Sequence, residues 1–137
     1  MGRILAIDFG LKRTGLAVTD TLQIIATSLD TVETLQLISF LKSYFLKEQV
    51  DEVVIGMPKQ MSNQDSQIAP QVRQFIEKFR SAFPTKPIVE VDERFTTVLA
   101  HRAMIEGGMK KKDRRVKGNV DKISATIILQ NYLEGKR

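Results

Sequence analysis

Three short β-prone segments occupy the first 29 residues, before any helical pattern begins. They span residues 3–9, 14–20 and 23–29, and Gly10 and Gly15 punctuate the first turn. Apolar segments of this length, separated by short polar breaks, predict strands that pair consecutively. The chain is therefore expected to open with an antiparallel meander of three strands.

The remaining chain alternates between helical and strand patterns. Apolar residues recur at helical spacing over residues 31–49, and Asp30 or Thr31 could cap that helix. The next expected elements are a strand at 51–57, a loop at 59–65, a helix at 66–83 and a strand at 88–93.

Two further helices are expected in the last third of the chain. One begins at Thr96 or Thr97 and ends near Gly107-Gly108, and Asn119 could cap the last one. The apolar face of this last helix is expected to include Ile123, Ile127, Ile128 and Leu133.

This order predicts an α/β fold with a mixed five-stranded sheet, in which the meander is followed by parallel strands joined by crossover helices. With 137 residues, 42% of them hydrophobic, the chain has the size of one domain, expected to span residues 1–137. Helices should flank the sheet.

Composition narrows the possible chemistry. The chain has no cysteine, which excludes disulfides and thiolate catalysis, so a bound metal would need oxygen ligands or the single His101. We assign His101 no role. No signal peptide is apparent, and no apolar run approaches the roughly 20 residues of a membrane helix. A cytoplasmic protein without a membrane partner is expected.

The net charge of +5 is concentrated in one segment. Residues 101–118 have five more basic than acidic residues, whereas the rest of the chain is balanced. This distribution suits a face that binds nucleic acid, although it also suits a solvated loop. The basic residues are Arg102, Lys110, Lys111, Lys112, Arg114, Arg115 and Lys117.

Acidic residues lie at the ends of three expected elements. Asp8 ends the first strand, Asp92 and Glu93 end the last strand, and Asp121 begins the last helix. Ends of strands present ligand sites in open α/β sheets, and carboxylates bind hard divalent cations. Two such ions could activate water and stabilise the leaving oxygen of a phosphodiester. Each carboxylate also has a structural alternative. Asp8 could start a turn, Asp92 and Glu93 could pair with Arg94, and Asp121 could complement a helix dipole.

The segment from Gly10 to Gly15 has two possible roles. Its glycines would let backbone N–H groups approach a phosphate, and Lys12 and Arg13 would add charge. The segment matches no standard phosphate-binding pattern, so it could equally be a hairpin turn.

Four segments together resemble the YqgF family, also called RuvX, which is described as a pre-16S rRNA nuclease or as Holliday junction resolvase-like. The match covers nearly the whole chain. The segments are IDFGLKRTGLAVTD from Ile7, GMPK from Gly56, DERFTT from Asp92, and VDKISA through LQNYL from Val120.

The resemblance implies a ribonuclease H-like fold, a cytoplasmic nuclease and a part in maturing the 5′ end of 16S rRNA. It implies that Asp8, Glu93 and Asp121 hold Mg²⁺ or Mn²⁺, with two ions expected. Asp92 is an alternative to Glu93, but successive strand residues face opposite ways, and we prefer Glu93. The partner would be precursor rRNA or a ribosomal particle, with contacts from Lys12, Arg13, Arg94 and the basic segment Lys110–Lys117.

Several readings stay open at this point. After Pro58 the chain reads KQMSNQDS, where many relatives have a glycine-containing acidic loop, so substrate contacts there are unassigned. An actin-like ATPase would need a second domain. A non-catalytic RNA-binding assembly factor and a DNA junction resolvase also fit the pattern. The sequence leaves RNA against DNA, endo- against exonuclease action, and oligomeric state undecided.

Overall fold

The structure, a computed structural model, describes residues 2–57, 68–92 and 117–136. Within them, for residues 92, 117–123 and 136 it describes the backbone alone. The strands are β1 (Arg3–Asp8), β2 (Arg13–Thr19), β3 (Ala26–Glu33), β4 (Val50–Met57) and β5 (Ile88–Asp92). The helices are the 3₁₀ turn η1 (Thr34–Gln36), α1 (Leu37–Lys47), α2 (Ala69–Ala82) and α5 (Lys117–Lys136).

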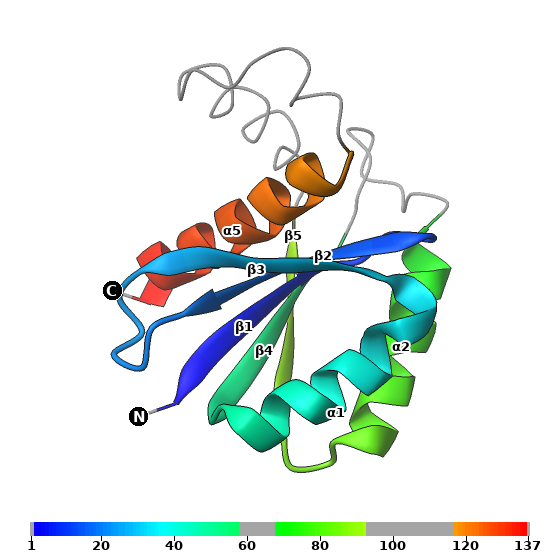
Figure 1. The fold of residues 1–137 in the computed structure, drawn as a ribbon, viewed down its shortest axis with the longest axis horizontal. Coiled ribbons are helices and arrows are strands. Elements are labelled where there is room, and N and C mark those ends of the chain that lie inside the picture. Colours follow the sequence, from blue (N-terminus) through cyan, green and yellow to red (C-terminus); the bar gives the residue numbers. More distant parts are fainter. Residues whose placement is uncertain (1, 58–67, 93–116, 137) are drawn as a thin grey trace.

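One five-stranded sheet, in the order β3-β2-β1-β4-β5, forms the centre of the described chain. β1 pairs antiparallel with β2 and parallel with β4, while β3 pairs antiparallel with β2 and β5 parallel with β4. The predicted mixed sheet is confirmed. Because β1, β4 and β5 run in the same direction, their carboxyl ends meet at one edge of the sheet (Figure 1).

Helices cover both faces of this sheet. α1 and α2 lie on one face and α5 lies on the other (Figure 1). β1 alternates between them, since Leu5 and Ile7 belong to the cluster on the α1/α2 side and Ile4 and Ala6 to the cluster on the α5 side. This alternation determines which layer each residue at the end of β1 faces.

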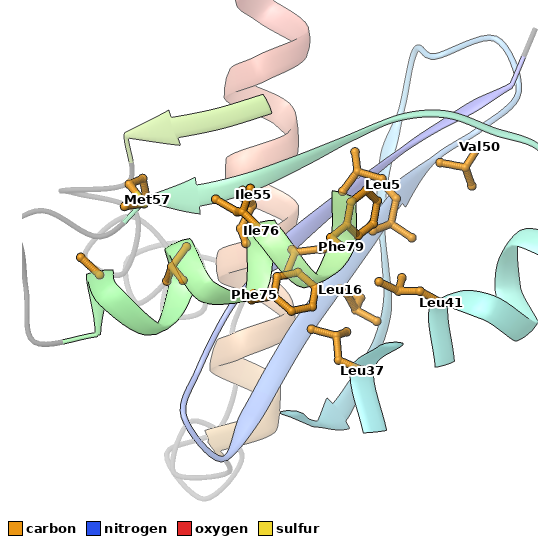
Figure 2. Close-up of a cluster of buried hydrophobic side chains, with 14 residues drawn as sticks. Leu5, Leu16, Leu37, Leu41, Val50, Ile55, Met57, Phe75, Ile76 and Phe79 are labelled. Atoms are coloured by element: carbon orange, nitrogen blue, oxygen red, sulfur yellow. The ribbon is translucent and has the colours of Figure 1, made fainter. Parts of the chain in front are cut away.

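Aliphatic side chains and the rings of Phe75 and Phe79 pack together under α1 and α2 (Figure 2). Phe79 is fully buried, with ring centroids 6.2 Å from Phe75 and 5.0 Å from Phe83. Removal of such a ring costs about 3–5 kcal/mol, so this cluster holds both helices firmly on the sheet.

The third strand was predicted too early in the chain. Residues 23–25 belong to the β2–β3 turn, and the strand runs from Ala26 to Glu33. The Asp20 carboxylate organises this turn by accepting the backbone N–H groups of Ile24 at 2.8 Å and Ile25 at 2.9 Å. These two isoleucines are therefore exposed turn residues instead of strand residues.

The first and last helices also begin elsewhere than expected. Asp30 and Thr31 lie within β3 and cap no helix, because pairing with β2 extends the strand to Glu33. Asn119 lies inside α5, which begins at Lys117. The helix expected from Thr96 or Thr97 to Gly107-Gly108 lies outside the described residues.

Leu35 and Leu46, which lie among the apolar residues at helical spacing over residues 31–49, are exposed. Leu35 lies in η1 and is 95% exposed, and Leu46 near the end of α1 is 89% exposed. Because η1 precedes α1, Leu35 is out of phase with Leu37 and Leu41, which are fully buried. In the part of the chain that the structure describes, no helix has the length and apolarity to cross a membrane.

Candidate active site at the carboxyl end of β1

Asp8 is the last residue of the central strand and lies on the α5 side of the sheet. Ile4 and Ala6, two positions apart on β1, pack in the α5-side cluster, and Asp8 continues this alternation. Its side chain is half-buried, unlike the fully buried residues before it. The strand therefore delivers one carboxylate to the edge of the sheet, where solvent and a ligand can reach it.

Glycines flank Asp8 on both neighbouring strands. Gly15 of β2 lies directly opposite Asp8, and paired residues of antiparallel strands point to the same face. On β4, Ile55 pairs with Ile7, so Gly56 occupies the next position along, beside Asp8. Neither neighbour carries a side chain, which leaves room on this face for a group bound to the carboxylate.

Thr34 fixes the β1–β2 turn that follows Asp8. The Thr34 hydroxyl donates to the Gly10 carbonyl oxygen at 2.6 Å and lies 2.9 Å from the Thr14 hydroxyl. The Thr34 backbone N–H also donates to the Lys12 carbonyl oxygen at 2.9 Å. Thr34, which follows β3 and begins η1, thus fixes the conformation of the β1–β2 turn through contacts that the sequence pattern does not reveal.

Gly10 is required in this turn for steric reasons. A Cβ atom at this position would lie against the Arg13 carbonyl oxygen, closer than non-bonded atoms can approach. The hairpin interpretation of the segment is confirmed, because it connects two paired strands. Lys12 of the turn and Arg13, the first residue of β2, have exposed side chains next to the end of β1.

The other predicted ligands are described in part. Asp92 ends β5 in register with Met57 of β4, at the same edge of the sheet as Asp8. Its side chain, like that of Asp121 in α5, is outside what the structure describes, and so is all of Glu93.

α5 starts at the edge of the sheet where β1 ends (Figure 1). Its last turns reach the opposite edge, because Leu133 and Glu134 line a pocket with Ile24 and Ile25 of the β2–β3 turn. This orientation puts the first turns of the helix, which contain Asp121, at the same end as Asp8.

Polar contacts fasten α5 along its length. The Ser28 and Thr126 hydroxyls lie 3.1 Å apart, and the Tyr132 hydroxyl donates to the Glu52 carboxylate at 2.8 Å. Ser124 is buried, with Ala125 and Leu129 in the same layer against the sheet. The helix is therefore held on both antiparallel and parallel parts of the sheet.

The chemistry of Asp8 suits a hard divalent cation. A half-buried carboxylate beside two glycines offers oxygen ligands and space for the waters or phosphate that complete such a shell. Among the described side chains, no three His, Cys, Asp or Glu residues gather into a metal-binding group.

Sequence reasoning missed the structural support of this site. Gly56 was noted as the start of the GMPK segment but not as a neighbour of Asp8, and Thr34 was placed in a helix. Thr34 contacts residues 20 and 24 positions away along the chain. Only the pairing of β2 with β3 brings it there.

The chain matches one family model and many known proteins along its whole length. A model described as "RuvX: Holliday junction resolvase" matches residues 2–135. A protein of Phocaeicola vulgatus is 57% identical and one of Bacteroides thetaiotaomicron 56% identical, each over 137 residues that cover 100% of this chain and 99% of the relative. Both are named "Putative pre-16S rRNA nuclease".

Solved structures agree on the fold. RuvC of T. thermophilus in complex with a Holliday junction substrate has a TM-score of 0.59 at 16% identity, over 99% of this chain and 96% of that one. A second structure of T. thermophilus RuvC gives 0.52 at 14% identity, over 98% and 96%. At this identity the likeness concerns the fold alone, and it confirms the predicted ribonuclease H-like architecture.

Proposed function

Because this chain belongs to the RuvX family, described as Holliday junction resolvases, we propose that it is a nuclease that hydrolyses phosphodiester bonds of nucleic acid. The observation that carries the proposal is identity above 50% with full-length relatives named as nucleases. The half-buried carboxylate of Asp8 at the end of β1 supports it, because it offers a place for hydrolysis on the ribonuclease H-like fold.

The proposed substrate is precursor 16S rRNA, cut during maturation of its 5′ end. The names of the relatives support this choice. The description of the family and the junction-bound RuvC structure favour a second candidate, a four-way DNA junction. A third candidate is an RNA-binding assembly factor that does not cut. We propose that the protein acts in the cytoplasm on free precursor rRNA or on ribosomal particles.

We assign the ligand set to Asp8, Glu93 and Asp121, and strand periodicity supports Glu93 over Asp92. Val89 and Val91 pack in the α5-side cluster. A strand that continued this alternation would bring position 93, and not position 92, to the α5 side where Asp8 lies. Asp92 would then face the α1/α2 side and take no part in the site.

Helix periodicity supports Asp121 in the same way. It precedes Ala125 by four residues and Leu129 by eight, and both of these are fully buried against the sheet. Residues at this spacing share one face of a helix. Asp121 would thus extend the sheet-facing stripe of α5 toward the end of β1.

Each group would have a separate task in hydrolysis, in which a water oxygen bonds to phosphorus as a phosphorus–oxygen bond breaks. Mg²⁺ or Mn²⁺, with two ions proposed, would supply positive charge where negative charge develops on the phosphate oxygens. Asp8 is held by β1, and Gly15 and Gly56 leave space for the phosphate. Lys12 and Arg13 would hold the neighbouring backbone of the substrate, as would Arg94 and the basic segment.

The substrate is identified by comparing cleavage of the two candidates under the same conditions. A 16S precursor fragment and a four-way DNA junction are each incubated with the protein in Mg²⁺, in Mn²⁺ or in EDTA. We expect cation-dependent cleavage of the precursor in preference to the junction. Preferential cleavage of the junction would reassign the substrate, and binding of the precursor without cleavage of either would establish the assembly factor instead.

A further inference from the structure

A cleft of about 280 Å³ opens beside the turn that follows Asp8, on the α1/α2 side of the sheet. Phe9 and Phe75, with ring centroids 5.4 Å apart, line its more buried part. Leu11 of the turn and Leu35 of η1 also line it, and they are 63% and 95% exposed. Leu11 and Leu35 are thus solvent-exposed apolar side chains beside the aromatic pair.

Polar groups from α2 complete the lining. Gln71, Gln74 and Lys78, which follow one another at helical spacing, border the cleft. An amide side chain both donates and accepts hydrogen bonds, and a lysine ammonium attracts phosphate. The exposed Lys12 belongs to the turn that contributes Leu11. The cleft therefore combines an apolar interior with hydrogen-bonding groups and a positively charged border.

We propose that this cleft binds one unpaired nucleobase of the nucleic acid that crosses the end of β1. A base has apolar faces, which suit Phe9, Leu11 and Leu35, and polar edges, which suit the amide of Gln74. The volume is slightly below the roughly 300–1,000 Å³ of whole small-molecule sites, which suits a single base. The assignment rests on the proposed nuclease function and adds a preference for single-stranded substrate to it.

The position of the cleft supports a nucleic acid over a protein partner. Asp8 and Phe9 are consecutive, but they face opposite sides of the sheet. A single strand of nucleic acid that passes over this edge of the sheet can therefore reach both residues. The base in the cleft would then lie within a few nucleotides of the phosphate at Asp8. An apolar peptide could cover Leu11 and Leu35, but it would not match the positive charge of Lys12 and Lys78.

Exposed residues provide variants that should leave the core intact. Leu35→Ser removes an apolar wall of the cleft, and Leu46→Ser is its matched control, since Leu46 is 89% exposed near the other end of α1. Gln74→Ala tests the polar edge separately. Melting temperatures of all three proteins would verify that each is folded.

The test combines these variants with abasic RNA. A single abasic site is moved one nucleotide at a time along the single-stranded part of a 16S precursor fragment, and binding is measured by fluorescence anisotropy in EDTA. We expect one position at which the missing base weakens binding by wild type and by Leu46→Ser about tenfold. Leu35→Ser should bind intact RNA more weakly than wild type, and the abasic site at that position should weaken its binding little further. For Gln74→Ala, the abasic site should weaken binding by an intermediate factor.

Equal abasic losses in wild type and Leu35→Ser at every position would overturn the proposal and would leave a protein contact as the role of the cleft. Cleavage in Mg²⁺ is measured separately, so the two proposals can fail independently. Normal cleavage without the abasic effect rejects the cleft alone. An abasic effect without cleavage rejects the nuclease and retains the base-binding cleft.

Discussion

Asp8 lies directly opposite Gly15 in the antiparallel pairing of β1 with β2, at the point where the central strand ends. The residue facing the proposed metal ligand across this pair is therefore one without a side chain. With Gly56 next to it on β4, both strand neighbours of Asp8 lack a side chain. Asp8 itself is half-buried at the end of a strand whose four preceding residues are fully buried.

Gly15→Val should abolish much of the activity without unfolding the protein. A valine would project beside Asp8 and occupy the space proposed for the phosphate, whereas β-branched residues are favourable in strands. We expect cleavage to fall more than tenfold and the melting temperature to be kept, with Gly15→Ala intermediate in activity. A folded valine variant with wild-type cleavage would show that this space is not used.

Two glycines should respond to alanine in opposite directions. At Gly10 the added Cβ meets the Arg13 carbonyl oxygen, so the β1–β2 turn must move and stability must fall. Nothing lies within 4 Å of a Cβ at Gly135 in α5, where alanine should raise the free energy of unfolding by up to about 1 kcal/mol. Urea denaturation of both variants checks this, and destabilisation at Gly135 would contradict it.

Stability should depend on pH through Asp20. The backbone N–H groups of Ile25 and Ile24 lower the pKa of this carboxyl group from its usual value of 3.8. A lowered pKa in the folded state stabilises the protein above the unfolded pKa, and this contribution is lost as pH falls through the folded value.

Asp20→Asn, which cannot ionise, should therefore melt below wild type at pH 6, and the difference should shrink as the pH falls below about 4. Asp30→Asn serves as control, because it makes the same change of charge at an exposed position of β3. Thermal melts between pH 3 and 7 provide the measurement. A difference that stays constant over this range would exclude the Asp20 carboxylate as its source.

The β2–β3 turn also shows why the sequence predicts the first three strands but not the bounds of the third. Ile24 and Ile25 read as strand residues, yet Asp20 binds their N–H groups and Gln23 takes a left-handed backbone (φ 59°), which ends the hairpin there. β3 in turn contains Asp30 and Thr31, which look like helix-capping residues. Pairing with β2 decides their conformation, and local pattern does not contain that information.

The candidate site was predictable to a similar degree. The position of Asp8 at the end of the first strand follows from sequence, because apolar alternation stops there. Its face does not, since this depends on which helix covers which side of the sheet. The glycine neighbours depend on strand register, and the cleft beside Phe9 depends on η1, whose short 3₁₀ turn brings Leu35 out of phase with α1.

The basic segment can be tested although it lies outside the described residues. Replacing Lys110, Lys111 and Lys112 with alanine should weaken binding and reduce the slope of log affinity against log salt by up to about 2, at roughly 0.7 per phosphate contact with a single strand. A variant that lacks the exposed Lys42 and Lys47 of α1 should keep the wild-type slope. Equal slopes in all three proteins would remove the segment from the interface.

Cleavage by Asp8→Asn tests the central claim most directly. The matched control is Asp30→Asn, which makes the same change of charge at an exposed position of β3. Both are assayed on the preferred substrate in Mg²⁺, with binding followed in parallel. The account predicts that Asp8→Asn binds but loses cleavage by at least a hundredfold, on the scale of a lost catalytic group, while Asp30→Asn cuts normally. Undiminished cleavage by a folded Asp8→Asn protein would contradict it.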